Sequence, residues 1–185
     1  MGDNGTVYHE RQRKQLCALH VLNNLFQEKD AFTQKFLDDI CTSLTPSRFM
    51  NPHRNMLGLG NYDVNVLTAA LQTKDLCLIW FDRRKKVEKV DFSKVKGVIL
   101  NVPSDYKLGF VKIPFDFKHW YVIREVQGAF YNLDSKLDKP IKLGERQAAV
   151  DFLNERLKDE KTQLLIVVEP SVETSGSWYM EDVNS

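Results

Sequence analysis

Cys17 is the residue whose type and position first suggest chemistry in this 185-residue chain. The segment QLCALHVLNNLF, residues 15–26, carries apolar residues at helical spacing, so it predicts a largely buried helix with Cys17 in its first turn. Unpaired backbone N–H groups and the positive end of the helix dipole lower the pKa of a thiol placed there. The sequence therefore predicts a nucleophile at Cys17, against the alternative that it is a small buried apolar residue.

His119 and Asp134 are predicted to lie side by side on one hairpin. Gln127-Gly128 separates two β-type segments, and glycine suits the positive φ that a two-residue turn requires. With that turn Tyr121 faces Asp134, and His119 is the diagonal neighbour of Asp134. Because successive side chains alternate between faces, the imidazole and the carboxylate share one side of this ribbon.

A thiol at a helix start, an imidazole on a strand and a carboxylate that orients the imidazole form the arrangement of a cysteine hydrolase. The remaining requirement is a donor for the oxyanion. Gln12, five residues before Cys17, could supply its side-chain amide next to the Cys17 backbone N–H, although by itself it is an ordinary surface glutamine.

Two other arrangements compete with this one. His20 follows Cys17 on the same helical face and is an alternative base, but no carboxylate is evident to orient it. Cys17 and His20 could also begin a zinc site, but a second close pair of Cys or His ligands is missing. Cys41 and Cys77 are interpreted as core residues, and no metal or other cofactor is expected.

The elements that position these residues are helices first and mostly strands later. Apolar stripes predict further helices over 33–44, ended by Pro46, over 62–72, capped by Asn61, and over 145–158. Short β-branched or aromatic runs predict strands over 77–81, 98–102, 120–126, 129–133 and 164–168. This order favours an α+β fold over an alternating parallel sheet.

The length suits a single domain. Residues 1–7 are expected to form a flexible N-terminus, 8–170 the catalytic domain, and 171–185 a mostly polar tail with Trp178 and Tyr179 as anchors. Residues 47–60, rich in Asn, Pro and Gly, are predicted to be a loop.

Composition places the chain among globular proteins, with 43% hydrophobic and 28% charged residues. The formal net charge of +1 gives no global field that favours nucleic acid, so no nucleic-acid partner is expected. Three widely spaced cysteines, without a signal peptide or a long apolar run, favour a reducing compartment: the cytoplasm or also the nucleus.

Three short motifs are given ordinary interpretations. Gly2 with Thr6 fits an N-myristoylation pattern that often arises by chance, so membrane attachment is not expected. The basic run from Arg83 to Lys86 is interpreted as a solvated strand connection rather than a site for an anionic partner. The glycines of 58–60 lack the spacing of a phosphate loop.

Four sequence blocks carry a family resemblance: YHERQRKQLCALHVLNNLFQ, GNYDVNV, KHWYVIRE and FYNLDSKL. They occur in the order found in the Josephin family of cysteine deubiquitinases, and the chain resembles especially its short single-domain members, over about residues 8 to 178. The resemblance implies that Cys17 is the nucleophile, His119 the general base, Asp134 the orienting residue and Gln12 the oxyanion glutamine. Other Josephin proteins have Asn at the third position, so Asp134 is a variation that adds a charge.

The resemblance also implies a papain-like fold in which a helical part carrying the nucleophile packs on an antiparallel sheet carrying the base. A helical arm over 27–61 would flank the cleft. The expected partners are ubiquitin and ubiquitinated proteins, acted on by a monomer. Trp120 is a candidate wall for the ubiquitin tail, and Phe26, Tyr62 and Trp80 are candidate contacts for its apolar patch, with the core as the alternative place for each.

Two alternatives stay open at this level. The first is a ubiquitin-binding module whose cleft is inactive or blocked, so that it recruits rather than cleaves. The second is an acyltransferase that uses the same Cys, His and Asp on a small acyl donor.

Overall fold

A six-stranded antiparallel sheet organises the computed structural model, which describes residues 6–13, 16–44, 62–104, 107–108, 111–112 and 117–181. The elements run in the order α1 (Cys17–Phe26), α2 (Gln34–Leu44), α3 (Val64–Gln72), β1 (Cys77–Trp80), η1 (Val87–Lys89), η2 (Phe92–Lys94), β2 (Val95–Ser104), β3 (Lys107–Leu108), β4 (Val111–Lys112), β5 (Phe117–Val126), β6 (Ala129–Asn132), β7 (Ile141–Gly144), α4 (Arg146–Leu157), β8 (Gln163–Val168) and α5 (Pro170–Ser175).

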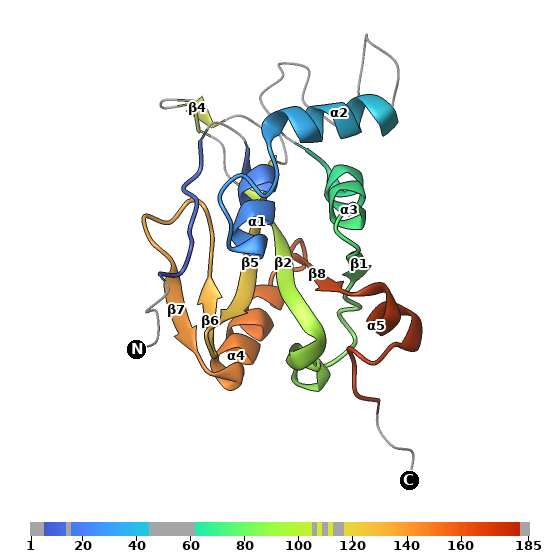
Figure 1. Ribbon diagram of the computed structural model, residues 1–185. Helices are drawn as coiled ribbons and strands as arrows, with labels where there is room; N and C mark the ends of the chain where they lie inside the picture. The colour runs from blue at the N-terminus through green and yellow to red at the C-terminus, as the bar shows by residue number, and fades with distance from the viewer. Residues whose placement is uncertain are drawn as a thin grey trace, which may run out of the picture.

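The strands follow one another across the sheet in the order β1-β8-β2-β5-β6-β7 (Figure 1). Every neighbouring pair is antiparallel. Helices cover both faces of this antiparallel sheet, so the predicted α+β fold is confirmed. None of the helices in the described residues is long and apolar enough to cross a membrane.

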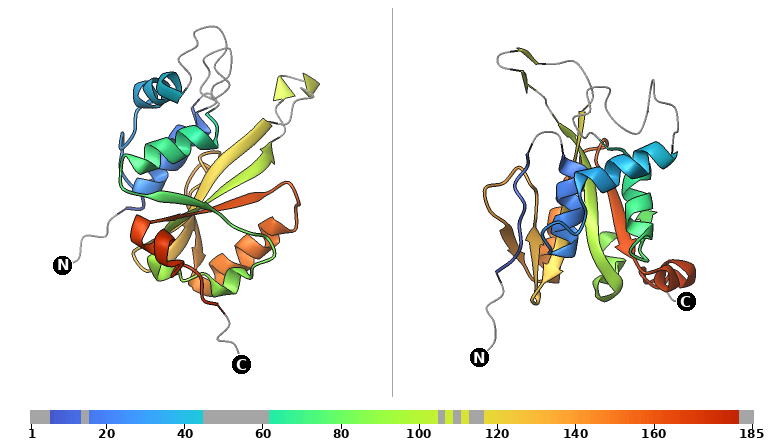
Figure 2. Two further views of the ribbon diagram at one scale, coloured as in Figure 1. Left: turned by 90° about the vertical axis from the view of Figure 1, so that its right-hand side faces the viewer. Right: turned by 45° about the horizontal axis from the view of Figure 1, so that its top comes forward.

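The alternation of side chains along the strands builds a core on each face of the sheet. On β8, Leu165 and Val167 join the core beneath α1, α2 and α3, whereas Leu164 and Ile166 join the core beneath α4. Figure 2 shows α1–α3 on one side of the sheet and α4 on the other. A strand buried on both faces is apolar throughout, which is why the run LLIVV was recognisable as β8.

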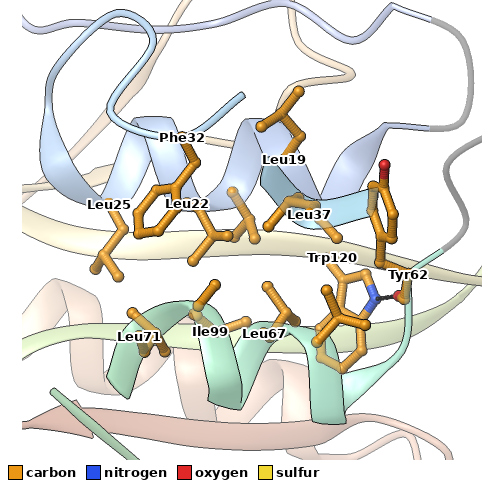
Figure 3. Packing of buried hydrophobic residues seen from close by; sticks show 14 of the residues in the cluster. Leu19, Leu22, Leu25, Phe32, Leu37, Tyr62, Leu67, Leu71, Ile99 and Trp120 are labelled. Carbon is orange, nitrogen blue, oxygen red and sulfur yellow. Dashed lines mark hydrogen bonds between the residues drawn. The ribbon is translucent and has the colours of Figure 1, made fainter. Parts of the chain in front are cut away.

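Helix α1 lies directly on the centre of the sheet. Leu22 and Leu25 are fully buried beside Ile99 of β2 (Figure 3). The approach is closest at Gly97, where an added Cβ would lie 2.6 Å from Leu25 Cδ1 and 3.3 Å from the Ile123 carbonyl oxygen. A side chain at residue 97 would therefore require the Leu25 side chain to shift.

The predicted start of the third helix is wrong. Helix α3 begins at Val64 and is capped by Asp63, whose carboxylate accepts hydrogen bonds from the N–H groups of Asn65 and Val66. The predicted cap, Asn61, lies outside the described residues, as do the predicted loop over 47–60 and the end of the second helix at Pro46.

The C-terminal segment is more ordered than a polar tail. Residues 170–175 form α5, Tyr179 forms a β-bridge with Val90, and Trp178 is buried in the core under α4. The anchoring role predicted for Trp178 and Tyr179 is therefore confirmed. Strand β7 was also missed, because IKLG is an edge strand of only four residues, too short for its alternation to stand out.

The basic run between β1 and η1 makes contacts with other parts of the fold. Arg83 donates hydrogen bonds to the carbonyl groups of Leu157, Asp159, Glu160 and Thr162, where α4 ends. Of the neighbouring cations, Arg84 pairs with Asp82 at 2.6 Å, and Lys85 lies over the ring of Tyr179, 4.3 Å from its centroid. The interpretation as a strand connection holds, and Arg83 adds a structural function to it.

Replacing Arg83 by Ala should lower the free energy of unfolding by about 1–3 kcal/mol, because several carbonyl groups at the end of α4 lose a charged donor. Urea denaturation followed by circular dichroism measures this. Arg84→Ala is the matched control and should leave the midpoint almost unchanged, since its ion pair is exposed. Equal effects of the two substitutions would contradict the capping role of Arg83.

Candidate active site

Cys17 is the first residue of α1, as predicted. The residue at the N-cap is Leu16, which has no side-chain oxygen that could bind the free N–H groups of the first turn. The backbone N–H groups of Trp120, Ala18 and Cys17 itself instead stabilise the sulfur as a thiolate, helped by the charge of Lys136. The helix start and β5 thus form a polar cradle around one sulfur atom.

Burial nevertheless outweighs that cradle. The Cys17 residue is 4% exposed, and desolvation raises the pKa of its thiol above the usual range. The prediction of a thiol pKa lowered by the helix start is therefore wrong for the free protein. The reason is that a helix dipole acts on every first-turn cysteine, whereas the desolvation depends on tertiary packing that the local sequence does not show.

His119 and Asp134 form the predicted pair. Gln127 and Gly128 both have positive φ, 53° and 78°, and the two-residue turn aligns Val126 with Ala129. In this register His119 Nε2 lies 2.6 Å from Asp134 Oδ1. Since a carboxylate only accepts, Nε2 carries the proton and the other ring nitrogen, Nδ1, is left as the basic atom.

Asp134 is fixed at several atoms. Its Oδ1 also accepts the Lys136 N–H at 2.9 Å, and its own N–H donates to Asn132 Oδ1 at 3.0 Å. Burial raises the pKa of this carboxyl, but the hydrogen bond and charge of His119 and the N–H and charge of Lys136 bring it below its usual value. Asp134 is therefore an ionised, oriented acceptor at neutral pH.

The site has two halves that meet at the main chain of β5. Cys17 contacts the N–H of Trp120, the residue after His119. Among the described residues, no hydrogen bond joins the Cys17 thiol to the His119 imidazole. Such bonds are often long in unliganded enzymes and shorten when substrate binds. His119 and Asp134 also line an open cavity of about 650 Å³ whose other wall is the end of α4.

An extended segment, residues 8–13, runs from α1 to the loop that carries Asp134, and we call it the strap. Its Glu10 N–H donates to Asn24 Oδ1 at 2.6 Å, and Asn24 Nδ2 donates to the Leu133 carbonyl at 2.9 Å. Asn23 Nδ2 donates a hydrogen bond to the Glu10 carboxylate at 2.9 Å. These residues were missed by sequence reasoning; the signal was two adjacent asparagines in a helix that is otherwise buried and apolar.

His20 belongs to the same network rather than to the site. Its Nε2 accepts the Arg13 N–H at 3.0 Å, and its Nδ1 lies 3.0 Å from Glu10 Oε2. The statement that no carboxylate orients His20 is therefore wrong. Because both ring nitrogens face the strap, the structure favours a supporting role for His20.

Gln12 lies on the strap, where its backbone N–H donates to the Ser135 carbonyl at 2.7 Å. This bond fastens Gln12 beside the residue that follows Asp134. Its function as an oxyanion donor stays a prediction.

The four predicted ubiquitin contacts differ in exposure. Tyr62 is 1% exposed and its hydroxyl donates to Asp38, so its side chain is a core residue and not a surface contact. Trp120 is buried and its indole N–H donates to the Tyr62 carbonyl at 3.2 Å (Figure 3). Phe26 packs against the core at its edge, whereas Trp80 is 52% exposed and accessible to a partner.

The other two cysteines lie away from the site. Cys41 is buried in the core under α2, as predicted, whereas Cys77 is only partly buried on the edge strand β1. A hydrogen bond with Glu173 raises the pKa of Cys77 to about 11. Within the described ranges no group of three or more His, Cys, Asp or Glu side chains could hold a metal ion.

Comparison with known proteins identifies the relatives of this chain. The Josephin family model matches residues 12–168. Josephin-2 of Homo sapiens is 46% identical over 177 residues, covering 96% of this chain and 94% of that protein. A Josephin-like protein of Drosophila melanogaster is 46% identical over 164 residues, covering 88% of this chain and 74% of that protein.

More distant similarity extends to larger proteins. Ataxin-3 of Homo sapiens is 27% identical over 153 residues, covering 73% of this chain and 38% of that protein. Among solved structures, the catalytic domain of Trichinella spiralis UCH37 bound to ubiquitin vinyl methyl ester matches with a TM-score of 0.38 and 16% identity. The match covers 90% of this chain and 68% of that chain.

The raised pKa of Cys17 predicts how the thiol reacts in the free protein. In a chain with Cys41→Ser and Cys77→Ser, alkylation of Cys17 by iodoacetamide should still accelerate above pH 9, because the thiolate is the reactive form. Lys136→Gln should move this profile to higher pH, since it removes a charge that favours the thiolate. A rate that is already constant below pH 7 would show instead a preformed thiolate. Mass spectrometry of the alkylated peptide gives the rates.

Proposed function

Because this chain belongs to the Josephin family, we propose that it is a thiol-dependent deubiquitinase that hydrolyses the peptide or isopeptide bond after the C-terminal glycine of ubiquitin. The observation that carries the proposal is the 2.6 Å hydrogen bond between His119 and Asp134, next to a cysteine at a helix start. These are the base, the orienting group and the nucleophile of a cysteine hydrolase.

The acylation step uses His119 as a base. As the Cys17 sulfur attacks the glycine carbonyl, Nδ1 of His119 accepts the thiol proton, and Asp134 stabilises the resulting imidazolium. A thiol that is protonated in the free protein needs this proton transfer, so the raised pKa of Cys17 is compatible with general-base catalysis. The carbonyl oxygen becomes an oxyanion, which the Cys17 N–H and the Gln12 side chain would hold.

The remaining steps return the enzyme to its starting state. The imidazolium donates its proton to the departing lysine amine as the carbon–nitrogen bond breaks, which leaves a thioester. His119 then takes a proton from water, whose oxygen attacks the thioester carbonyl. The carbon–sulfur bond breaks, ubiquitin leaves with a free carboxylate, and Cys17 regains its proton.

A second candidate function is a ubiquitin-binding module with little or no hydrolytic activity. The specific observation in its favour is that no hydrogen bond links Cys17 to His119 among the described residues. The two functions can be distinguished by covalent bond formation. Only the enzyme forms a bond between the Cys17 sulfur and the C-terminal carbonyl carbon of ubiquitin.

Ubiquitin that carries a thiol-reactive electrophile at its C-terminus should form one covalent adduct with the chain, located at Cys17 by peptide mapping. Cys17→Ala should abolish the adduct while ubiquitin binding persists, and His119→Ala should reduce its formation strongly. Cys77→Ser is the matched control and should label normally. Binding without any adduct in the unmodified chain would favour the recruiting module, and full labelling of Cys17→Ala would refute the assignment of the nucleophile.

Asp134→Asn should keep the hydrolysis of a ubiquitin C-terminal fluorogenic amide within about tenfold of the unmodified chain, because an amide oxygen can accept from both His119 and the Lys136 N–H. Asp134→Ala should lower kcat/KM by about 100-fold or more, since His119 loses its orienting partner. If Asn is as poor as Ala, then the charge of Asp134 is required and not its hydrogen bond alone.

A further inference from the structure

His9 makes a contact that the catalytic scheme does not use. Its Nε2 lies 2.9 Å from the backbone carbonyl oxygen of Asp134, across 125 positions of sequence. A carbonyl oxygen can only accept, so His9 Nε2 carries the proton of this bond. His9 thus donates a hydrogen bond from the strap to the main chain of Asp134, the residue whose carboxylate binds His119.

The Asp134 carbonyl has one other donor among the described residues. The N–H of Leu137, in the same loop, donates to it at 2.9 Å. The other bonds of Asp134 come from Asn132, Lys136 and His119, all on the hairpin or its following loop. His9 is therefore the contact that fixes this loop residue against a different part of the molecule.

The strap meets the loop a second time through Gln12, whose N–H donates to the carbonyl of Ser135 at 2.7 Å. One short segment is thus bonded to two consecutive residues, Asp134 and Ser135. The strap is itself held on α1, since Glu10 N–H donates to Asn24 Oδ1 at 2.6 Å. Together these bonds fix the position of the strap, including Gln12, relative to the loop that carries Asp134.

We propose that His9 is a positioning residue: it holds the main chain of Asp134 so that the carboxylate keeps the His119 imidazole in its catalytic orientation. The inference rests on the proposed function for its consequence in catalysis, and on the observed bonds for its geometry. His9 acts through Asp134 and touches no reacting atom.

The first test is steady-state hydrolysis of a ubiquitin C-terminal fluorogenic amide. His9→Ala should lower kcat by about tenfold and leave KM within about twofold, because orientation and not substrate binding is lost. His9→Gln, whose amide N–H reaches as far as the imidazole, should recover most of the rate, whereas the shorter His9→Asn should not. Equal rates for Gln and Asn, or an unchanged rate for Ala, would overturn the proposal.

Arg11→Ala is the matched control. Arg11 joins the same strap to the same loop through a 2.6 Å ion pair with Asp138, but both side chains are exposed and neither contacts Asp134. It should leave kcat near the unmodified value. A loss equal to that of His9→Ala would show that any loosening of the strap has the same effect and would overturn the specific role of His9.

A double-mutant cycle tests whether His9 acts on catalysis through the carboxylate of Asp134. In an Asp134→Ala background the carboxylate is absent, so His9→Ala should cause no further loss of kcat. Multiplicative losses would show that His9 acts elsewhere, and the proposal would fail.

A spectroscopic readout separates this proposal from the proposed function. The His119 Nε2–H proton, in its 2.6 Å bond to Asp134, should shift and exchange faster with water in His9→Ala but not in Arg11→Ala. If the unmodified chain hydrolyses no ubiquitin substrate while this proton responds as expected, the enzyme assignment fails and the positioning role stands. If hydrolysis is normal and the proton is unaffected by His9→Ala, the positioning role fails alone.

Discussion

The arrangement of the site depends on two hydrogen bonds made by the buried side chain of Asn24. It accepts from the Glu10 N–H and donates to the Leu133 carbonyl, so one amide joins the helix that carries Cys17, the strap and the residue before Asp134. Asn24 is fully buried, so removing its amide would leave the Glu10 N–H and the Leu133 carbonyl without these hydrogen bonds, at considerable cost. One buried amide of α1 thereby binds two other segments at once, and the neighbouring bonds of Asn23 and His20 add to its effect.

The parts of the site that could be predicted from sequence are those fixed by local rules. The turn chemistry of Gln127-Gly128 and the alternation of a strand place His119 beside Asp134, and the observed register agrees with both. Cys17 at the start of α1 follows in the same way from apolar periodicity. Each of these arguments spans fewer than about 20 residues, a range over which backbone geometry alone determines which side chains are neighbours.

The parts that could not be predicted depend on contacts between distant segments. The bond between His9 and Asp134 joins positions 125 residues apart, and no periodicity or turn rule connects them. The prediction for the pKa of Cys17 was wrong for the same reason: the helix start is local, but the desolvation that raises this pKa comes from the tertiary burial of the thiol. The basic run at Arg83 looked like a solvated connection because its acceptors, the carbonyl groups after α4, lie more than 70 positions later.

The two halves of the site have different mechanical supports, and this determines where the site can adjust. His119 and Asp134 are joined by the hairpin and by a direct bond, so they move together. Cys17 belongs to α1, whose Leu25, near the C-terminal end of the helix, packs closely over Gly97 of β2. The separation between thiol and imidazole therefore depends on how α1 lies against β5, whereas the orientation of the imidazole depends on the hairpin and the strap. Because Asn24 and His20 of α1 also hold the strap, a movement of this helix is transmitted to the loop that carries Asp134.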